Sequence, residues 1–361
     1  MENKIIKVGI IGCGGIANGK HMPSLKKLPN VEMVGFCDII PERAEKAKAQ
    51  FGTPDAKTYT DYKELLKDPE IEVVHVLTPN REHADISIDA LYAGKHVMCE
   101  KPMAKTAADA RRMLEAAEKT GKKLTIGYQH RHKPQSRDAK KRIDAGELGE
   151  IYYANCLAIR RRGTPNWGVF LDEEAQGGGP IIDIATHSLD LTLYLMNNYE
   201  PEMVIGKTHK KLEHPEAGNI WGDNGVSTTP LEEAACAMIR MKNGATIMLE
   251  TSWALNTCEP VQEGSCVLCG SKEGLQIKNN QLKINRIEFD RETDTAVNTK
   301  AGGVAFYSGA AGAPHEVEAA NWIKSIVDDT APVVLPEQAL VVSEILEAIY
   351  ESSKTGKPVY F

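Results

Sequence analysis

A short glycine motif near the start of the chain is the first group of residues whose spacing suggests chemistry. The motif follows an apolar stretch, 5–11, and opens a helical stretch. It reads Gly12-Cys13-Gly14-Gly15-Ile16-Ala17, the pattern G-x-G-x-x-A. Gly12 permits a tight turn, Gly14 lets the backbone approach a pyrophosphate, and Ala17 allows close helix–strand packing. The free N–H groups and the dipole of a helix N-terminus favour an anion. The motif therefore predicts a dinucleotide site.

An acidic residue stands where such a site needs one. Asp38 ends the next apolar strand, about twenty residues beyond the motif. A carboxylate at this place accepts hydrogen bonds from the adenosine ribose hydroxyls and repels a 2′-phosphate. Ile39 and Ile40 supply no compensating cation, so the sequence predicts NAD in preference to NADP. We expect Arg43 to approach the adenine, with a solvated helix arginine as the alternative.

Two cysteines have the spacing of a possible second chemical centre. Cys266 and Cys269 have the spacing C-x-x-C, but the sequence contains no second such pair. The segment 265–275 reads as strand, turn, strand, and positions three apart on a strand point to opposite faces. A structural zinc needs four ligands, so no metal site is predicted. Eight cysteines in a chain of this length suit thiols in a reducing compartment.

The elements that must position the motif alternate strand and helix over about the first 125 residues. This alternation predicts a doubly wound parallel sheet. The expected strands are 5–11, 31–37, 73–77, 96–99 and 123–127, and the expected helices are 41–51, 62–67, 83–92 and 107–119.

The pattern changes after His132. Longer strand-like stretches are expected at 151–159, 203–208, 234–240, 246–253, 266–269 and 282–289, with helices at 135–145, 181–196 and 337–354. We therefore predict an α/β protein: a Rossmann domain over residues 1–127, and an α+β domain with one large, mainly antiparallel sheet over residues 128–361. The last helix could pack back on the Rossmann domain.

Composition and charge narrow the function. The 361 residues carry 43 Lys plus Arg and 50 Asp plus Glu, and the basic residues are scattered apart from Arg160-Arg161-Arg162. This distribution argues against nucleic acid as a partner. No stretch approaches the ~20 apolar residues of a membrane span, and the first residues do not read as a signal peptide. We expect a cytoplasmic protein with no membrane partner.

Three further motifs extend the interpretation. Thr78-Pro79-Asn80 with His83, then Glu100-Lys101-Pro102, and finally Asp183-Ile-Ala-Thr-His187 together resemble the Gfo/Idh/MocA oxidoreductases, the family of glucose–fructose oxidoreductase and inositol dehydrogenase. The resemblance covers nearly the whole chain. It implies two domains, a nicotinamide cofactor, polyhydroxylated substrates and assembly into a homo-oligomer (a dimer, a tetramer or a larger assembly) through the sheet of the second domain.

The resemblance also implies roles for individual residues. Lys101 would lie near the nicotinamide and the reacting carbon, and Asp183 and His187 would bind and activate the substrate hydroxyl. Physical reasoning agrees, because hydride removal from a secondary alcohol needs a base for the hydroxyl proton and histidine titrates near neutral pH. Residues four apart share one helix face. Whether Lys101 or His187 is the principal base stays open.

The remaining candidates come from these motifs, from the start of the second domain and from the stretch 160–168. Cofactor contacts are expected from Thr78, Pro79, Asn80, His83, Glu100, Lys101 and Arg131, and substrate contacts from Lys101, Tyr128, Arg160, Trp167, Asp183 and His187. For Trp167 simple packing is the alternative, and for Arg160 a solvated loop.

The sequence thus predicts an NAD-dependent enzyme that oxidises a secondary hydroxyl of a sugar or glycoside. C3 of a glucosyl unit, with an aglycone tolerated, is the preferred position. Two alternatives are an inositol dehydrogenase and a glycosidase that uses NAD transiently and releases free sugar. A non-catalytic dinucleotide-sensing regulator is disfavoured because Lys101 and His187 are both present.

Overall fold

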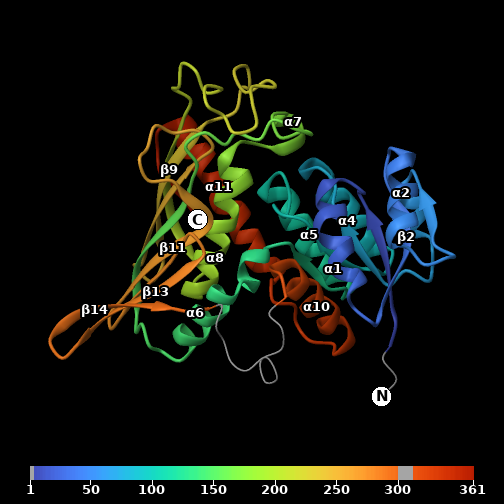
Figure 1. Ribbon diagram of the computed structural model, residues 1–361, viewed down its shortest axis with the longest axis horizontal. Coiled ribbons are helices and arrows are strands. Elements are labelled where there is room, and N and C mark those ends of the chain that lie inside the picture. The colour runs from blue at the N-terminus through green and yellow to red at the C-terminus, as the bar shows by residue number, and fades with distance from the viewer. Residues whose placement is uncertain (1–3, 300–311) are drawn as a thin grey trace. The chain divides into compact units, whose positions relative to one another are not determined.

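A computed structural model describes residues 4–299 and 312–361, which divide into two compact units (Figure 1). The first unit runs to Gln129 and also includes Gly312–Leu340; the second begins at His130 and includes Val341–Phe361. The predicted fold class is confirmed, a Rossmann sheet followed by a domain with a mainly antiparallel sheet. No helix among the described residues is long and apolar enough to cross a membrane.

The first unit is built on a six-stranded parallel sheet in the order β3-β2-β1-β4-β5-β6. The order runs outward from β1 in both directions, so the loops after β1 and β4 meet at the switch point where doubly wound sheets bind ligands. The strands are β1 (Ile6–Ile11), β2 (Val31–Cys37), β3 (Lys57–Tyr59), β4 (Val73–Val76), β5 (His96–Cys99) and β6 (Leu124–Ile126).

The helices of the first unit begin and end at recognisable signals. α2 starts with Pro41 at its first position, and α5 is capped by Thr106, whose hydroxyl accepts from the Asp109 N–H, and ends at Gly121 in the left-handed region. The helices are α1 (Met22–Lys26), α2 (Pro41–Phe51), α3 (Tyr62–Leu66), α4 (His83–Tyr92), α5 (Ala107–Thr120) and α10 (Pro314–Val327).

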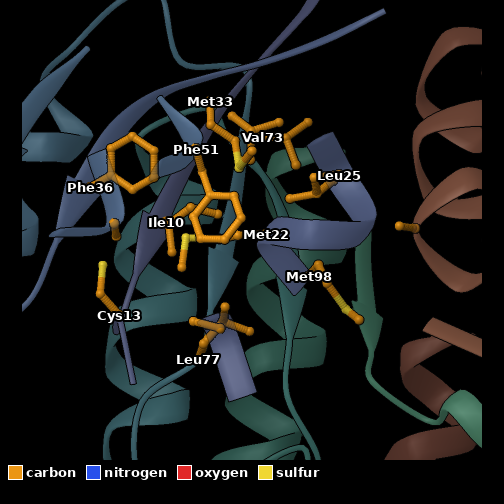
Figure 2. Packing of buried hydrophobic residues seen from close by; sticks show 14 of the residues in the cluster. Ile10, Cys13, Met22, Leu25, Met33, Phe36, Phe51, Val73, Leu77 and Met98 are labelled. Atoms are coloured by element: carbon orange, nitrogen blue, oxygen red, sulfur yellow. The ribbon is translucent and has the colours of Figure 1, made fainter. Parts of the chain in front are cut away.

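A buried hydrophobic cluster fixes β1 against the helix that follows the glycine motif. Figure 2 shows Ile10 of β1 close to Met22 and Phe51, and all three are almost fully buried. The same cluster includes Trp322 of α10, so a helix from far along the sequence completes this core. Burying each such side chain contributes about 1.5–3 kcal/mol.

The second unit is built on a nine-stranded sheet in the order β14-β13-β12-β11-β7-β10-β9-β8-β15. All neighbours are antiparallel except β7 and β10. The strands are β7 (Ile151–Ile159), β8 (Pro201–His209), β9 (Ala234–Met241), β10 (Thr246–Ser252), β11 (Val261–Gly270), β12 (Gly274–Lys278), β13 (Gln281–Glu288), β14 (Arg291–Val297) and β15 (Val359–Tyr360).

Helices lie along this sheet, with α8 packed on β7 and β11 (Figure 1). The segment predicted as one helix over 181–196 is a π-helical turn, Ile181–Ala185, continued by α8. The other helices are α6 (Pro134–Asp144), α7 (Glu173–Gln176) and α11 (Pro336–Thr355), whose residues up to Leu340 belong to the first unit.

A buried ion pair joins the start of the second unit to α8. The Arg131 Nη2 atom lies 2.6 Å from Asp190 Oδ1, and its Nε atom donates to both carboxylate oxygens. Neither side chain is exposed, and the guanidinium lies over the Tyr194 ring, 4.6 Å from its centroid. Burial raises the pKa of Asp190, and the Arg131 charge opposes that rise. Each charge therefore depends on the other.

Arg131→Ala should lower the free energy of unfolding by about 3–5 kcal/mol, because it leaves an uncompensated buried carboxylate. Arg240→Ala is the matched control, since Arg240 pairs with Glu202 on the surface, where both side chains are 43% exposed; its loss should be below about 1 kcal/mol. Urea unfolding measures both. Equal losses would show that the buried pair contributes no more than a surface one.

Candidate active site

The glycine motif forms the turn that the sequence predicts. Gly12 follows β1 with φ +91°, and a Cβ atom there would lie 2.6 Å from the Leu77 carbonyl oxygen. By contrast, a Cβ atom at Gly14 or Gly15 would meet no atom within 4 Å. The turn therefore packs tightly against the loop after β4 at Gly12. At Gly14 and Gly15 it leaves space in which a ligand can approach the backbone.

Asn18, which the sequence analysis did not single out, orients this loop. Its Nδ2 atom donates to the carbonyls of Cys13 (2.7 Å) and Gly14 (2.8 Å). In a planar trans peptide the N–H points opposite to the carbonyl. The N–H groups of Gly14 and Gly15 therefore point away from Asn18, where they can bind an anion.

Asp38 is held beside the same loop. One carboxylate oxygen accepts from the Cys13 N–H and the other from the Ile40 N–H, both at 2.9 Å. A carboxylate has about four acceptor positions, so each oxygen retains one for a ribose hydroxyl. Burial raises the pKa of the Cys13 thiol to about 12, which keeps it neutral next to Asp38. Arg43 lies exposed on α2. These residues fit the pyrophosphate and ribose of a dinucleotide.

A buried carboxylate anchors the turn that carries Lys101. Glu100 Oε1 lies 2.7 Å from His21 Nε2, and Glu100 Oε2 accepts from the Lys101 N–H at 3.0 Å. Burial alone would raise the pKa of Glu100, but the hydrogen bond and charge of His21, with Lys101, lower it to about 2. His75 Nδ1 lies 3.3 Å from His21 Nδ1, and burial holds the pKa of His75 well below its usual value.

His83 joins the two predicted cofactor loops of the first unit. Its ring nitrogens lie 2.8 Å from the Pro102 carbonyl and 3.0 Å from the Thr78 carbonyl, and burial lowers its pKa. The loop after β4 continues through Pro79 into a short helical turn that begins at Asn80. Through these two carbonyls, His83 connects the loop after β4 to the loop after β5.

In the second unit the Asp183 carboxylate is fixed by two side chains. Its Oδ2 atom accepts from Trp253 Nε1 at 2.9 Å and lies 3.9 Å from Arg160 Nη1. His187, in the first turn of α8, is nearly buried, and its ring lies against His130 with centroids 4.8 Å apart. Both predicted residues thus come from one helical segment, and π-helical turns such as the one carrying Asp183 are common at functional sites.

Glu232 caps this helical segment and was not predicted. Its carboxylate accepts from the N–H groups of Gly179 (3.0 Å) and Ile181 (3.3 Å), and Tyr350 donates its hydroxyl to the same group at 2.7 Å. A Cβ atom at Gly178 would come within 2.0 Å of that hydroxyl. The glycines before the helix therefore allow a close approach by Tyr350.

The remaining predicted residues are placed as follows. Arg131 forms the buried ion pair with Asp190, and Tyr128 is fully buried at the end of the first unit. Trp167 is 48% exposed and contacts Phe170 and Trp221. Within the described residues, no three His, Cys, Asp or Glu side chains converge as metal ligands. The predicted strand, turn, strand around Cys266 is confirmed as β11 and β12.

Comparison with known proteins agrees with this geometry. A family model described as an oxidoreductase family with an NAD-binding Rossmann fold matches residues 6–128, and the model for the C-terminal alpha/beta domain of that family matches residues 140–361. The first unit is therefore an NAD-binding Rossmann domain.

Individual relatives cover nearly the whole chain. D-glucoside 3-dehydrogenase of Escherichia coli K12 is 30% identical over 99% of this chain and 98% of its own. An inositol 2-dehydrogenase/D-chiro-inositol 3-dehydrogenase of Lactiplantibacillus plantarum is 27% identical over 92% of this chain and 86% of its own. The structure of levoglucosan dehydrogenase in complex with NADH and levoglucosan has a TM-score of 0.82 at 22% identity, over 99% of each chain.

Gly12→Ala should lower NADH affinity by about tenfold or more, because an alanine at positive φ whose Cβ meets a carbonyl must displace the loop. Gly19→Ala is the control: it lies in the following helical turn, and its Cβ would meet nothing within 4 Å. Fluorescence titration with NADH measures both. Unchanged affinity for Gly12→Ala would contradict the assigned turn.

Glu100 should make stability depend on pH at the acid end. Its pKa is about 2 in the folded protein against an ordinary value of 4.5, so the unfolded state binds the proton more tightly. The stabilisation is present above about pH 4.5 and is lost as the pH falls toward 2, by on the order of 3 kcal/mol. Unfolding of Glu100→Gln across this range should show a shallower dependence, whereas Glu118→Gln, at an exposed position on α5, should follow the wild type. Parallel curves for all three proteins would exclude this assignment.

Proposed function

The chain belongs to the Gfo/Idh/MocA family of oxidoreductases, and from this premise we propose that it transfers a hydride between a secondary hydroxyl of a sugar or glycoside and NAD. The proposal is carried by one observation. Asp183 and His187 come from a single capped helical segment, and each is held by an aromatic neighbour, Trp253 for Asp183 and His130 for His187.

The residues of the second unit suit the handling of a hydroxyl. We assign to the Asp183 carboxylate the role of accepting a hydrogen bond from a sugar hydroxyl, because Trp253 and Arg160 hold it in a fixed orientation. His187 is the candidate base that takes the hydroxyl proton. Its ring is oriented by packing against His130, so little entropy is lost when the substrate binds.

The first unit contributes the cofactor cradle and Lys101. NAD, when bound, supplies the acceptor for the hydride. Lys101 is the second candidate for proton transfer to or from the alcohol, and the bond from its N–H to Glu100 fixes the backbone from which its side chain extends. The orientation of Asp38 supports NAD over NADP, since a 2′-phosphate would face that carboxylate.

For the substrate we propose a glucoside oxidised at C3. The support is the likeness to D-glucoside 3-dehydrogenase along nearly the whole of both chains. Inositol is the second candidate, favoured by the likeness to inositol 2-dehydrogenase/D-chiro-inositol 3-dehydrogenase. A glycosidase that uses NAD transiently would differ from both in releasing free sugar with no oxidised product.

We further propose assembly through the large sheet. On its face away from α8, Ile205, Met238 and Met248 are neighbours in register across β8, β9 and β10. All three keep part of their surface exposed. A row of apolar side chains on an open sheet face is suited to a second copy of the chain.

Lys101→Ala and His187→Ala should each lower kcat about 100-fold or more for methyl glucoside, because each removes a candidate proton-transfer group. Lys119→Ala and His214→Ala, at exposed positions, are the matched controls and should behave as the wild type. The assay uses NAD⁺ with glucose, methyl and phenyl glucosides and inositols, and follows NADH by absorbance and products by mass spectrometry.

The expected product is lighter than the substrate by two hydrogen atoms. Turnover confined to inositols would support the second candidate, and free sugar without oxidised product would support the glycosidase. Full activity in both site variants would overturn the assignment of Lys101 and His187.

A further inference from the structure

Three aromatic side chains gather in the part of the second unit that Arg160 and Trp253 connect to the Asp183 carboxylate, and the proposed proton transfer uses none of the three. Trp167 contacts Trp221 edge to face, with ring centroids 4.8 Å apart and planes at 80°, and contacts Phe170 at 5.5 Å and 65°. Trp167 is 48% and Trp221 39% exposed. We call these three residues the aromatic patch. Exposed tryptophans in contact are costly to leave in water, and such a patch marks a binding surface.

A single guanidinium connects the aromatic patch to Asp183. The Arg160 Cζ atom lies over the Trp221 ring, 5.7 Å from its centroid, while Nη1 of the same group lies 3.9 Å from Asp183 Oδ2. The other terminal nitrogen, Nη2, lies 3.5 Å from Glu263 Oε1. One guanidinium therefore contacts both the patch and the carboxylate. This separation is suited to a ligand made of two linked rings, with one ring at the carboxylate and the other at the patch.

The aromatic patch packs on the same hydrophobic cluster as Trp253, the residue that donates a hydrogen bond to Asp183. Phe170 packs against a buried cluster that includes Trp253, and Trp253 donates its indole N–H to Asp183. The patch and the carboxylate thus rest on the same hydrophobic core and cannot move independently without breaking that packing.

Two loops are joined so that the tryptophans are held in place. Asn166 Nδ2 donates to the carbonyls of Trp221 (2.7 Å) and Gly222 (2.8 Å). Asn219 accepts from the Thr164 N–H at 2.9 Å and donates to the Thr164 carbonyl at 3.1 Å. These bonds connect residues about fifty-five positions apart. Preorganisation of this kind lowers the entropy lost on binding.

We propose that the aromatic patch is a subsite for the aglycone of the substrate, and that it selects a planar apolar group such as an aryl ring. This inference rests on the proposed function, because it places the glucosyl unit at Asp183. The side-chain amides of Asn166 and Asn219 that border the patch donate to backbone carbonyls. A second sugar ring would need partners for several hydroxyls, whereas an aryl ring needs only a flat apolar surface.

The test compares phenyl glucoside with methyl glucoside, which share the glucosyl unit and its linkage. Isothermal titration calorimetry measures affinity for both ligands without requiring turnover, and steady-state kinetics give kcat/KM for both. The wild type should prefer the phenyl glucoside. Trp221→Ala and Trp167→Ala should each lower the phenyl-to-methyl ratio by about tenfold, the value of an aromatic contact. An effect that reaches Asp183 through Arg160 falls on both glucosides alike and cancels in this ratio.

Two further variants separate a ligand contact from a change in folding. Trp221→Phe keeps an aromatic ring and should recover most of the ratio. Phe289→Ala removes an aromatic residue that is 97% exposed, directly after β13, and should leave the ratio unchanged. Thermal melts of all variants exclude loss of the fold as the cause.

The outcomes distinguish the two proposals. An unchanged ratio in both tryptophan variants, or an equal fall for both glucosides, overturns the subsite. A disaccharide that depends on the tryptophans more than phenyl glucoside does overturns the choice of an aryl group. Binding of phenyl glucoside that depends on the tryptophans, without oxidation of any glucoside, supports the subsite and refutes the proposed function.

Discussion

The organisation of the first unit depends on the hydrogen bond between His21 and Glu100. It connects the helix that follows the glycine motif to the turn after β5, two segments almost eighty residues apart. The second oxygen of the same carboxylate holds the Lys101 N–H. Glu100 is buried, and the hydrogen bond and charge of His21, with the charge of Lys101, lower its pKa against the effect of burial. Gly127 leaves the room that the carboxylate occupies, because a Cβ atom there would lie 3.3 Å from it. The cradle for the dinucleotide and the backbone of Lys101 therefore form one rigid arrangement.

The second unit uses the same physical device with different residues. Buried or half-buried carboxylates are satisfied by donors from distant segments: Asp183 by Trp253, Glu232 by Tyr350 and backbone N–H groups, and Asp190 by Arg131. Each bond fixes a part of the helical segment that carries Asp183 and His187. Because a buried polar group without a partner is costly, these contacts specify one arrangement of the segment over others.

Regular elements were predictable where a local signal marked both ends. β2, β5, β7, α2 and α4 have the bounds that hydrophobic patterning and turn residues predict. The exposed strand β14 was missed because none of its residues is buried, so its pattern carries little apolar signal. The helix α10 was missed although its sequence contains a helix signal. Pro314 stands at its first position, and Ala319, Trp322 and Ile323 have the spacing of a buried helix face. Asn18, Glu232 and Trp221 could not be found in the same way. Asn18 donates to backbone carbonyls, and the sequence does not show which way those carbonyls point in the turn. The partners of Glu232 and Trp221 lie fifty or more positions away in the sequence.

Arg160 shows why position matters more than residue type in the second unit. A run of three arginines is compatible with a substrate contact or with a solvated loop, and the structure places the Arg160 guanidinium between a tryptophan ring and a carboxylate. A cation in this place attracts both neighbours, so a displacement of the patch is felt at Asp183 through a single side chain. Contacts to a remote part of a substrate can be used to orient the part that reacts. In the proposed subsite, binding of an aglycone would orient the reacting hydroxyl as well as add affinity.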